Sequence, residues 1–351
     1  MEYVTTETTG KEGYPVAQAM WIRVFPSSAD FIKKCPWYYE NKNFSSSIYL
    51  LRELGEKDVL GAISSVSRSY NSKNGEQVVG LCADFAVDKK HQSLVPALKL
   101  VKSLIKGSHE KCDILLGFPN NKSVNVMCRA GFRLLGELPR YALILKSKPY
   151  IKETHLSRFG TLITVPVDLF LRFYFWVSRC KHFSDYELTE VFSADELFDK
   201  LWTTCSEQND LYIGKRDRTY LNWRFFANPI NKSRIFVLKQ NKTHELVGYA
   251  VFRVNAGGHW YAHDFFALSG NKILKCLMQK VIATAIKENA ISLSIEFLGN
   301  KEVTQLLDRL KFSKRISERR VVLAQLKESN EYQKDIYDIN NWFITSADEL
   351  G

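Results

Sequence analysis

The two halves of this 351-residue chain share residues that recur at one constant spacing. Asp84-Phe85 ends an apolar run, and Asp264-Phe265 ends another run 180 residues later. Two further pairs recur at the same offset: Asn120 with Asn300, and Phe132 with Phe312. Self-similarity over so long a period indicates two copies of one supersecondary plan. The sequence therefore predicts two related structural units.

Each unit reads as antiparallel strands followed by strand, helix, strand, helix and strand, which is typical of an α+β fold with a mixed, mostly antiparallel sheet flanked by helices. In the first unit the predicted strands and helices are 47–51, 58–69, 78–87, 94–105, 113–118, 123–130, 132–137 and 141–145. In the second they are 234–239, 246–254, 260–268, 273–287, 291–297, 303–310 and 319–325. We place the units at 1–148 and 216–330, joined by a helical linker at 149–215 and followed by a C-terminal tail at 331–351.

Composition limits the class of protein without choosing a function. Hydrophobic residues make up 45% and charged residues 25%, which is ordinary for globular domains. The formal charge of +11 favours acidic partners, but the basic residues form no periodic stripe that would predict nucleic-acid binding. The seven cysteines include no CxxC pair and no zinc-ligand spacing. No metal site is expected.

The expected location is cytoplasmic, because the polar N-terminus contains no apolar signal segment. Between the units, the apolar stretch 159–177 contains Asp168 and Arg172 and has basic flanks. It is too short and too charged for a comfortable transmembrane helix. Two interpretations stay open: a helix packed between the units, and an interfacial helix that makes peripheral contact with anionic lipid.

A strand that leads through a short polar loop directly into a helix carries the clearest chemical signal. The strand ends with Phe85, Ala86 and Val87, the loop is 88–93, and the apolar-periodic helix starts at Leu94. A helix N-terminus presents unpaired backbone N–H groups and partial positive charge, so it can hold a pyrophosphate without any special side chain.

Here the chain resembles the GNAT superfamily of N-acetyltransferases. Gln92 and Ala97 match the first and last positions of that family's pyrophosphate loop, whereas Val95 stands where glycine is usual. The segment after the family's fifth strand is matched by Asn120, Ser123 and Gly131-Phe132. Met127 stands in place of the tyrosine that in the family often protonates the departing thiolate. The second copy keeps Asn300 and Phe312 but nothing of the loop. The resemblance therefore implies two tandem GNAT-like domains, of which the first binds acetyl-CoA or another acyl-CoA.

The resemblance also implies roles for particular residues. The cofactor-binding residues would be Phe85, Ala86, Val87, Gln92, Ser93, Leu94, Val95, Pro96, Ala97 and Asn120. Backbone amides at a bulge near Phe85 would polarise the thioester carbonyl, and Asp84 would accept the proton of the attacking group. For Asp84 a structural hydrogen bond shared with Asp264 is an equal alternative. Gly117-Phe118-Pro119-Asn120 and the run 220–225 also resemble bacterial tandem acetyltransferase-like proteins of polysaccharide biosynthesis.

The function implied is transfer of an acyl group to the amine or hydroxyl of a small molecule, such as a sugar, by direct attack on the thioester. Two alternatives stay open. The chain could be a binding or regulatory protein that kept the fold without the chemistry, or an acyltransferase that uses an acyl-carrier protein as its acidic partner.

Overall fold

The structure is a computed structural model that describes residues 2–25, 28–147, 183–268, 271–327 and 335–349, together with 149, 166, 168, 169, 173 and 175. The segment 159–177 lies almost wholly outside these residues, so membrane contact stays a prediction; of the predicted linker 149–215, the part from 183 onward is described. Within the described residues, no helix has both the length and the apolar character needed to cross a bilayer.

The first sheet has eight strands in the order β1-β2-β3-β4-β5-β15-β6, with β9 on the edge of β3. Their bounds are β1 (Tyr3–Thr9), β2 (Ser46–Glu53), β3 (Gly61–Ser72), β4 (Gly75–Val87), β5 (Ile114–Gly117), β6 (Arg133–Glu137), β9 (Ile213–Gly214) and β15 (Arg320–Gln325). Only β4 and β5 run parallel; the other pairs of this sheet are antiparallel.

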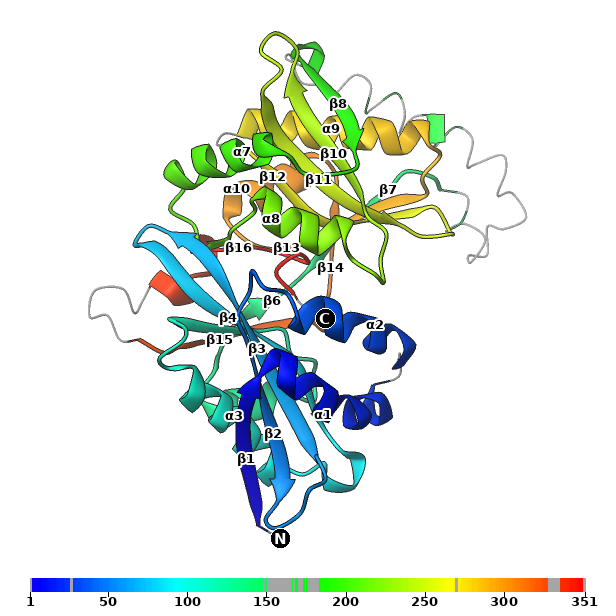
Figure 1. Ribbon diagram of the computed structural model, residues 1–351. Coiled ribbons are helices and arrows are strands. Elements are labelled where there is room, and N and C mark those ends of the chain that lie inside the picture. The colour runs from blue at the N-terminus through cyan, green and yellow to red at the C-terminus, as the bar shows by residue number, and fades with distance from the viewer. Residues whose placement is uncertain are drawn as a thin grey trace.

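Helices cover both faces of this sheet (Figure 1). They are α1 (Gly10–Val24) and α2 (Ser28–Tyr39) on one face, and α3 (Leu94–Ser108) and α4 (Val124–Ala130) on the other, with a 3-10 turn η1 (Lys89–His91) before α3. The two faces build separate apolar cores, with Trp21 of α1 in one and Leu100 of α3 in the other. Each helix buries one apolar stripe, as amphipathic periodicity requires.

The second sheet also has eight strands, in the order β14-β7-β13-β12-β11-β10-β8, with β16 on β13. Their bounds are β7 (Arg140–Ile144), β8 (Tyr186–Val191), β10 (Arg234–Gln240), β11 (Leu246–Val254), β12 (His259–Ala267), β13 (Ser292–Gly299), β14 (Ser313–Arg315) and β16 (Phe343–Thr345). The flanking helices are α7 (Glu196–Glu207), α8 (Arg218–Leu221), the π-helical turn η4 (Asn222–Phe226), α9 (Asn271–Lys287) and α10 (Lys301–Arg309). Two 3-10 turns precede β16: η5 (Asp335–Tyr337) and η6 (Ile339–Asn341).

The predicted fold class is confirmed: two α+β units, each with a mixed sheet and one parallel strand pair. In both units the repeated residues take equivalent places. Asp84 and Asp264 lie at β-bulges in β4 and β12. Asn120 and Asn300 accept backbone hydrogen bonds at the turns that lead into α4 and α10.

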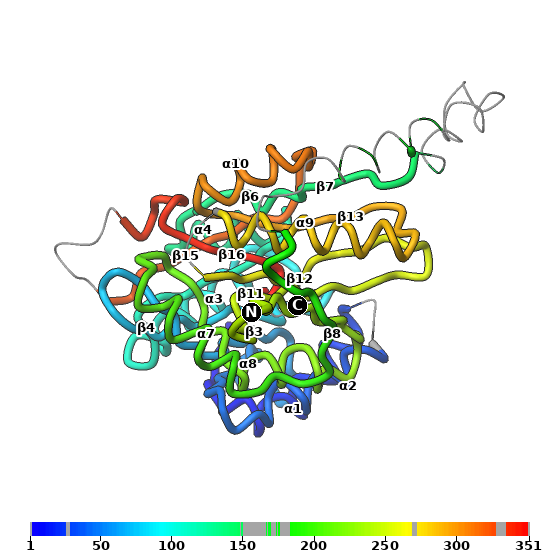
Figure 2. The backbone as a smooth tube through the Cα atoms, turned by 90° about the horizontal axis from the view of Figure 1, so that it is seen from above, coloured from blue at the N-terminus to red at the C-terminus, as the bar shows by residue number. Residues whose placement is uncertain are grey.

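The two units exchange their last strands, which the sequence did not predict. β7 is the last strand of the predicted first unit, 1–148, but it pairs with β13 and β14 of the second sheet. β15 is the last strand of the predicted second unit, 216–330, but it lies between β5 and β6 of the first sheet. The chain crosses between the two bodies in the middle of the molecule, where they meet in Figure 1. Seen from above, the two bodies lie one over the other (Figure 2). Each sheet is therefore complete only when both halves of the chain are folded.

Candidate functional site

A pocket opens in the first unit where the two parallel strands separate. β4 and β5 pair from Val79 with Ile114 up to Cys82 with Gly117, and no pairing continues beyond that point. The pocket there has a volume of about 300 Å³ and runs from the bulge of β4 to the turn before α4. It is lined by Phe25, Ile63, Cys82, Ala83, Asp84, Phe85, Gly117, Phe118, Pro119, Asn120, Ser123, Met127 and Glu349. We call this the strand-gap pocket.

The bulge that forms one wall of the pocket is held in place by α1 and α2. In the ladder with β3, Ser64 pairs with Ala83 and Ala62 pairs with Ala86, which leaves Asp84 and Phe85 as the bulged residues. Asp84 has a left-handed backbone, with φ of 52°, which aspartate tolerates better than most residues do. Its carbonyl oxygen accepts a hydrogen bond of 2.8 Å from the Trp21 indole.

The Asp84 carboxylate is buried, and each of its two oxygens has one partner. Lys34 Nζ lies 2.7 Å from Oδ1, and the Tyr39 hydroxyl donates to Oδ2 at 2.5 Å. Burial, and next the charge of Asp84, raise the pKa of Tyr39 well above its usual value of 10, so this hydroxyl stays protonated. A carboxylate that is paired and hydrogen-bonded in this way satisfies the requirement for a buried charge. Three side chains thus fix the bulge and the backbone amides it exposes.

The equivalent aspartate of the second unit has a closely similar set of partners. Arg216 Nε lies 3.2 and 3.1 Å from the two carboxylate oxygens of Asp264, and the Tyr249 hydroxyl donates to it at 2.7 Å. A cation and a tyrosine therefore hold the bulge in both units. This likeness agrees with the structural interpretation of Asp84, whereas its place in the pocket wall agrees with the catalytic one.

The loop after β4 folds without glycine. Among residues 85–97 no backbone takes a positive φ, so Val95 needs no left-handed conformation at the family's glycine position. The Gln92 side chain donates to the carbonyl oxygen of Val87 at 3.1 Å and closes the loop. At Ser93, the N-cap of α3, no side-chain hydrogen bond caps the helix. Val95 in the first turn is 66% exposed.

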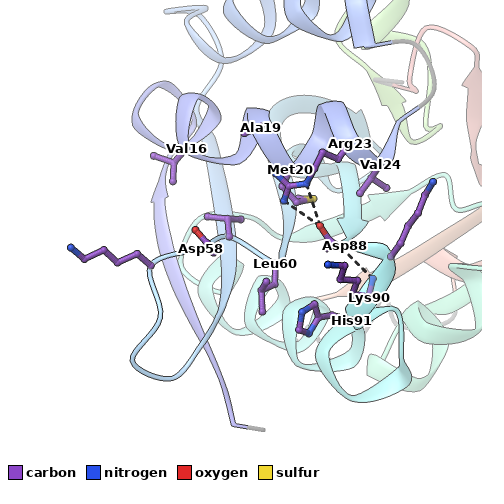
Figure 3. Close-up of a pocket in the computed structure, with 13 residues that line it drawn as sticks. Val16, Ala19, Met20, Arg23, Val24, Asp58, Leu60, Asp88, Lys90 and His91 are labelled. Carbon is purple, nitrogen blue, oxygen red and sulfur yellow. Dashed lines mark hydrogen bonds and ion pairs between the residues drawn. The ribbon is translucent and has the colours of Figure 1, made fainter.

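A second, larger pocket of about 720 Å³ lies between α1, the turn after β2 and the loop at η1 (Figure 3). Arg23 from α1 and Lys90 from the loop converge on Asp88 there, with 3.2 Å between Arg23 Nη2 and Asp88 Oδ2. The hydrogen bond from the Lys90 amide, with Arg23 next, holds the pKa of Asp88 below its usual range. Lys57 and Lys89 add positive charge to this pocket.

Met127 and Asn120 line the strand-gap pocket from the side of α4. The Asn120 side-chain oxygen accepts from the backbone amides of Lys122 and Ser123 at 3.0 Å each, which fixes this side chain at the edge of the pocket. Met127 packs against Gly117, where an added Cβ would lie 2.8 Å from the Met127 methyl group. A thioether has no proton to give, so Met127 cannot act as an acid.

The corresponding gap in the second unit is filled by the chain itself. β16 pairs antiparallel with the end of β13, from Phe297 with Thr345 to Gly299 with Phe343. The Phe343 ring packs on Phe265 and Phe297 at centroid distances of 5.4 and 5.0 Å. Gly299 has φ of 147°, and a Cβ there would fall 1.8 Å from the carbonyl oxygen of Trp342. Only glycine admits this strand so close to β13.

Among the predicted site residues, the structure brings Asp84, Phe85 and Asn120 together in the strand-gap pocket. Ala86 and Val87 are buried in the two cores beneath it, and residues 92–97 form the loop and the first turn of α3. The sequence interpretation missed Lys34, Tyr39 and Glu349. The first two lie on α2, whose helical pattern contains Pro36, and Glu349 belongs to a segment that reads as a tail.

Structural comparison identifies solved proteins with the same architecture. A protein of unknown function from Enterococcus faecalis V583, described as a probable N-acyltransferase, aligns with a TM-score of 0.65 at 12% identity, over 93% of this chain and 73% of that one. GCN5-related N-acetyltransferases from Anabaena variabilis and Kribbella flavida align with TM-scores of 0.62 and 0.58 at 13% and 12% identity. The alignments cover 93% and 92% of this chain, and 73% and 70% of those proteins.

At the level of sequence, no protein-family model matches the chain and no curated protein is similar to it. At 12–13% identity the structural likeness establishes the fold and leaves the activity open. The chain has, in two tandem copies, the fold of the GCN5-related N-acetyltransferases.

Proposed function

We propose that this protein is an acyl-CoA-dependent acyltransferase that acts on the amine or hydroxyl of a small acceptor, with the reacting thioester in the strand-gap pocket of the first unit. The observation that carries the proposal is the contrast between the two units. The gap between the parallel strands is open in the first unit and is filled by β16 in the second.

The residues around the strand-gap pocket, and the helix that follows β4, fit the chemistry of acyl-CoA. After the loop that follows β4, the N-terminus of α3 has no side-chain cap. The backbone N–H groups of Leu94 and Val95 and the positive end of the helix dipole suit a pyrophosphate. The pocket wall offers apolar surface from Phe85, Phe118 and Met127. Acyl-CoA would supply the acyl group as an activated thioester.

The chain's own groups then have distinct tasks. The fixed amides of the bulge at Asp84 and Phe85 would stabilise negative charge on the carbonyl oxygen, which is worth several kcal/mol in a water-poor site. The Asp84 carboxylate, already on the pocket wall, is the proposed acceptor of the proton that the attacking group loses. Because Met127 holds no proton, water is the proposed source of the proton for the departing thiolate.

The first test is calorimetry of CoA and acetyl-CoA with the full chain and with two variants of Val95. Val95→Glu places a carboxylate in the first turn of α3, where it would repel the pyrophosphate, whereas Val95→Gln changes the shape in the same way without the charge. We expect micromolar binding by the wild type, at least tenfold weaker binding by Val95→Glu, and at most threefold weaker binding by Val95→Gln. No binding by the folded wild type, or equal weakening in both variants, would contradict the proposal.

The two alternatives make different predictions. A regulatory protein would bind CoA, would bind it more weakly as the Val95→Glu variant, and would show no turnover with any acceptor. Its supporting observation is Met127 at the place of the usual acid. An enzyme that depends on an acyl-carrier protein would bind free CoA poorly and be active only with the carrier-linked thioester. The basic side chains of Lys57, Lys89 and Lys90 beside the larger pocket are the surface that would receive an acidic carrier.

A further inference from the structure

A third pocket, of about 440 Å³, lies on the second sheet close to the strand-gap pocket and is unusually rich in arginine. Four guanidinium groups line it, against two carboxylates, those of Glu296 and Glu349. The four are Arg140, Arg224, Arg253 and Arg319. We call this the arginine pocket. Glu349 also lines the strand-gap pocket, so the two cavities share a wall.

The register of the second sheet explains why these side chains converge. Residues paired directly across neighbouring strands point to the same face of a sheet. Arg253 of β11 pairs with Tyr261 of β12, which pairs with Ser294 of β13, and all three line the pocket. The next row along β13 pairs Glu296 with Arg140 of the exchanged strand β7. The exchange of strands thus brings Arg140 into the pocket.

One of the four arginines is neutralised, and the other three are not. Arg319 forms ion pairs with both Glu296 and Glu349, and the Ser346 hydroxyl donates to Glu296 at 2.7 Å. Among the described residues, no carboxylate pairs with Arg140, Arg224 or Arg253. Positive charge is therefore in excess on the wall of this pocket.

Arg224 gives the strongest indication of a ligand among the three. This residue is 92% buried, but not all of its N–H groups have a hydrogen-bond acceptor. Its Nη2 donates to the backbone carbonyl oxygen of Glu349 at 2.6 Å. Its Nε is buried and has no hydrogen-bond partner among the described residues. A buried, unsatisfied donor on a charged group costs free energy unless a ligand completes it.

His263 on the same wall remains neutral. Burial, and then the charges of Arg224, Arg253 and Arg319, lower the pKa of His263 to about 4. It can therefore act as a hydrogen-bond donor and acceptor near pH 7 without adding charge.

From this geometry we infer that the arginine pocket binds an oxyanion group, a carboxylate or a phosphate ester, of the acceptor molecule. The inference rests on the proposed function, since it assigns the acceptor's anchor next to the proposed thioester site. Guanidinium groups suit both anions because their N–H donors form paired, charge-assisted hydrogen bonds. An acceptor anchored here would present its amine or hydroxyl toward the strand-gap pocket past Glu349.

The test measures anion binding directly, in the absence of CoA. Inorganic phosphate and succinate are titrated at low ionic strength into the full-length protein, and the arginine Nε–H signals are followed by NMR. We compare the wild type with Arg253→Gln and Arg140→Gln, both exposed positions, and with Arg309→Gln as a matched loss of charge on α10, outside the pocket. Thermal unfolding confirms that each variant is folded.

We expect saturable binding of at least one probe, with a shift of the Arg224 Nε–H signal and a rise in the pKa of His263. Losing one arginine should weaken binding about tenfold or more, which is about 1.4 kcal/mol, because a charge-assisted hydrogen bond to the anion is removed. Arg309→Gln should bind as the wild type does. Which probe binds more tightly distinguishes a carboxylate from a phosphate.

The inference would be overturned if neither probe bound at tens of millimolar. It would also be overturned if Arg309→Gln weakened anion binding as much as Arg253→Gln or Arg140→Gln does. Val95→Glu separates this test from the proposed function. Anion binding that persists in Val95→Glu and is lost in Arg253→Gln belongs to the arginine pocket, whatever the outcome with CoA. Anion binding lost only in Val95→Glu belongs to the N-terminus of α3 and counts against the inference.

Discussion

One buried carboxylate, that of Asp348, links the C-terminal segment to both units. Removing this carboxylate tests how much the link contributes to stability. Asp348 has no solvent exposure, and its two oxygens face Arg68 Nη1 of β3 at 3.2 Å and Arg216 Nη2 at 2.9 Å. It also accepts from the Tyr70 hydroxyl at 3.1 Å and from the Thr345 amide at 3.0 Å. The network ties β16 of the second sheet to β3 of the first.

Replacing Asp348 with asparagine keeps the size and removes the charge. At an effective dielectric constant near 20, each of the two ion pairs is worth about 5 to 6 kcal/mol before desolvation. Arg216 keeps Asp264 as a partner, whereas Arg68, which is 2% exposed, keeps a carbonyl oxygen and the rings of Tyr220 and Tyr70 but no carboxylate among the described residues. Breaking a buried pair and leaving one charge uncompensated costs about 3–5 kcal/mol. We expect that decrease in the free energy of unfolding.

Urea unfolding of the wild type, of Asp348→Asn and of Asp335→Asn measures this quantity. Asp335 lies in the same segment but forms a surface ion pair with Lys73, and its loss should cost under about 1 kcal/mol. If Asp348→Asn also costs less than 1 kcal/mol, the buried network does not hold the units together and the reasoning fails.

The pH dependence adds an independent check. Burial alone would raise the pKa of Asp348, but Arg216 and Arg68 outweigh it, so the pKa in the folded state lies below the usual 3.8. A carboxylate with a depressed folded pKa contributes stability above its unfolded pKa, and that stability is lost as the pH falls through the folded pKa. The difference between wild type and Asp348→Asn should therefore be constant above about pH 5 and shrink below pH 4.

Two further predictions concern the bulge and the filled gap. The double variant Asp84→Asn, Lys34→Gln removes both buried charges together. If Asp84 is the base, this variant should bind CoA normally and its kcat should fall at least 100-fold. An unchanged kcat would assign Asp84 a structural role. Gly299→Ala should lower the free energy of unfolding by more than 3 kcal/mol, because its Cβ meets the carbonyl of Trp342, whereas Gly55→Ala, with φ of 85° and open space around it, should cost about 1 kcal/mol. Equal costs in urea unfolding would show that β16 does not depend on the close approach at Gly299.

The regular strands and helices of both units could be predicted because each buries one face, which leaves an alternating or helical pattern in the sequence. β4, predicted as 78–87, is Gly75–Val87, and α9, predicted as 273–287, is Asn271–Lys287. The strand exchange could not be predicted in the same way. The alternation of β7 shows which residues are buried, but the choice of neighbouring strand depends on contacts far away in the sequence.

The candidate site shows the same limit. The repeat identified Asp84, Asn120 and their second copies, and the family resemblance identified the loop. The side chains that fix Asp84 lie 50 and 45 residues earlier, on a helix with no strong pattern, so nothing local connects Lys34 or Tyr39 to it. The arginine pocket draws its members from four strands and turns of both halves. Only Arg224 lies in a run that the sequence analysis identified, 220–225, and nothing in that run connects it to Arg140, Arg253 or Arg319.

The second unit has a structural reason to keep the fold while losing the cofactor gap. By entering that gap, β16 brings the turn after it, with Asp348 and Glu349, to the junction of the two sheets. Glu349 then stands between the strand-gap pocket and the arginine pocket. The strand that fills the gap of the second unit is thus followed by the residue that completes the wall of the proposed acceptor site. On this view the second unit contributes to the reaction by shaping the acceptor side, and its strand β15 completes the sheet that carries the first unit's pocket.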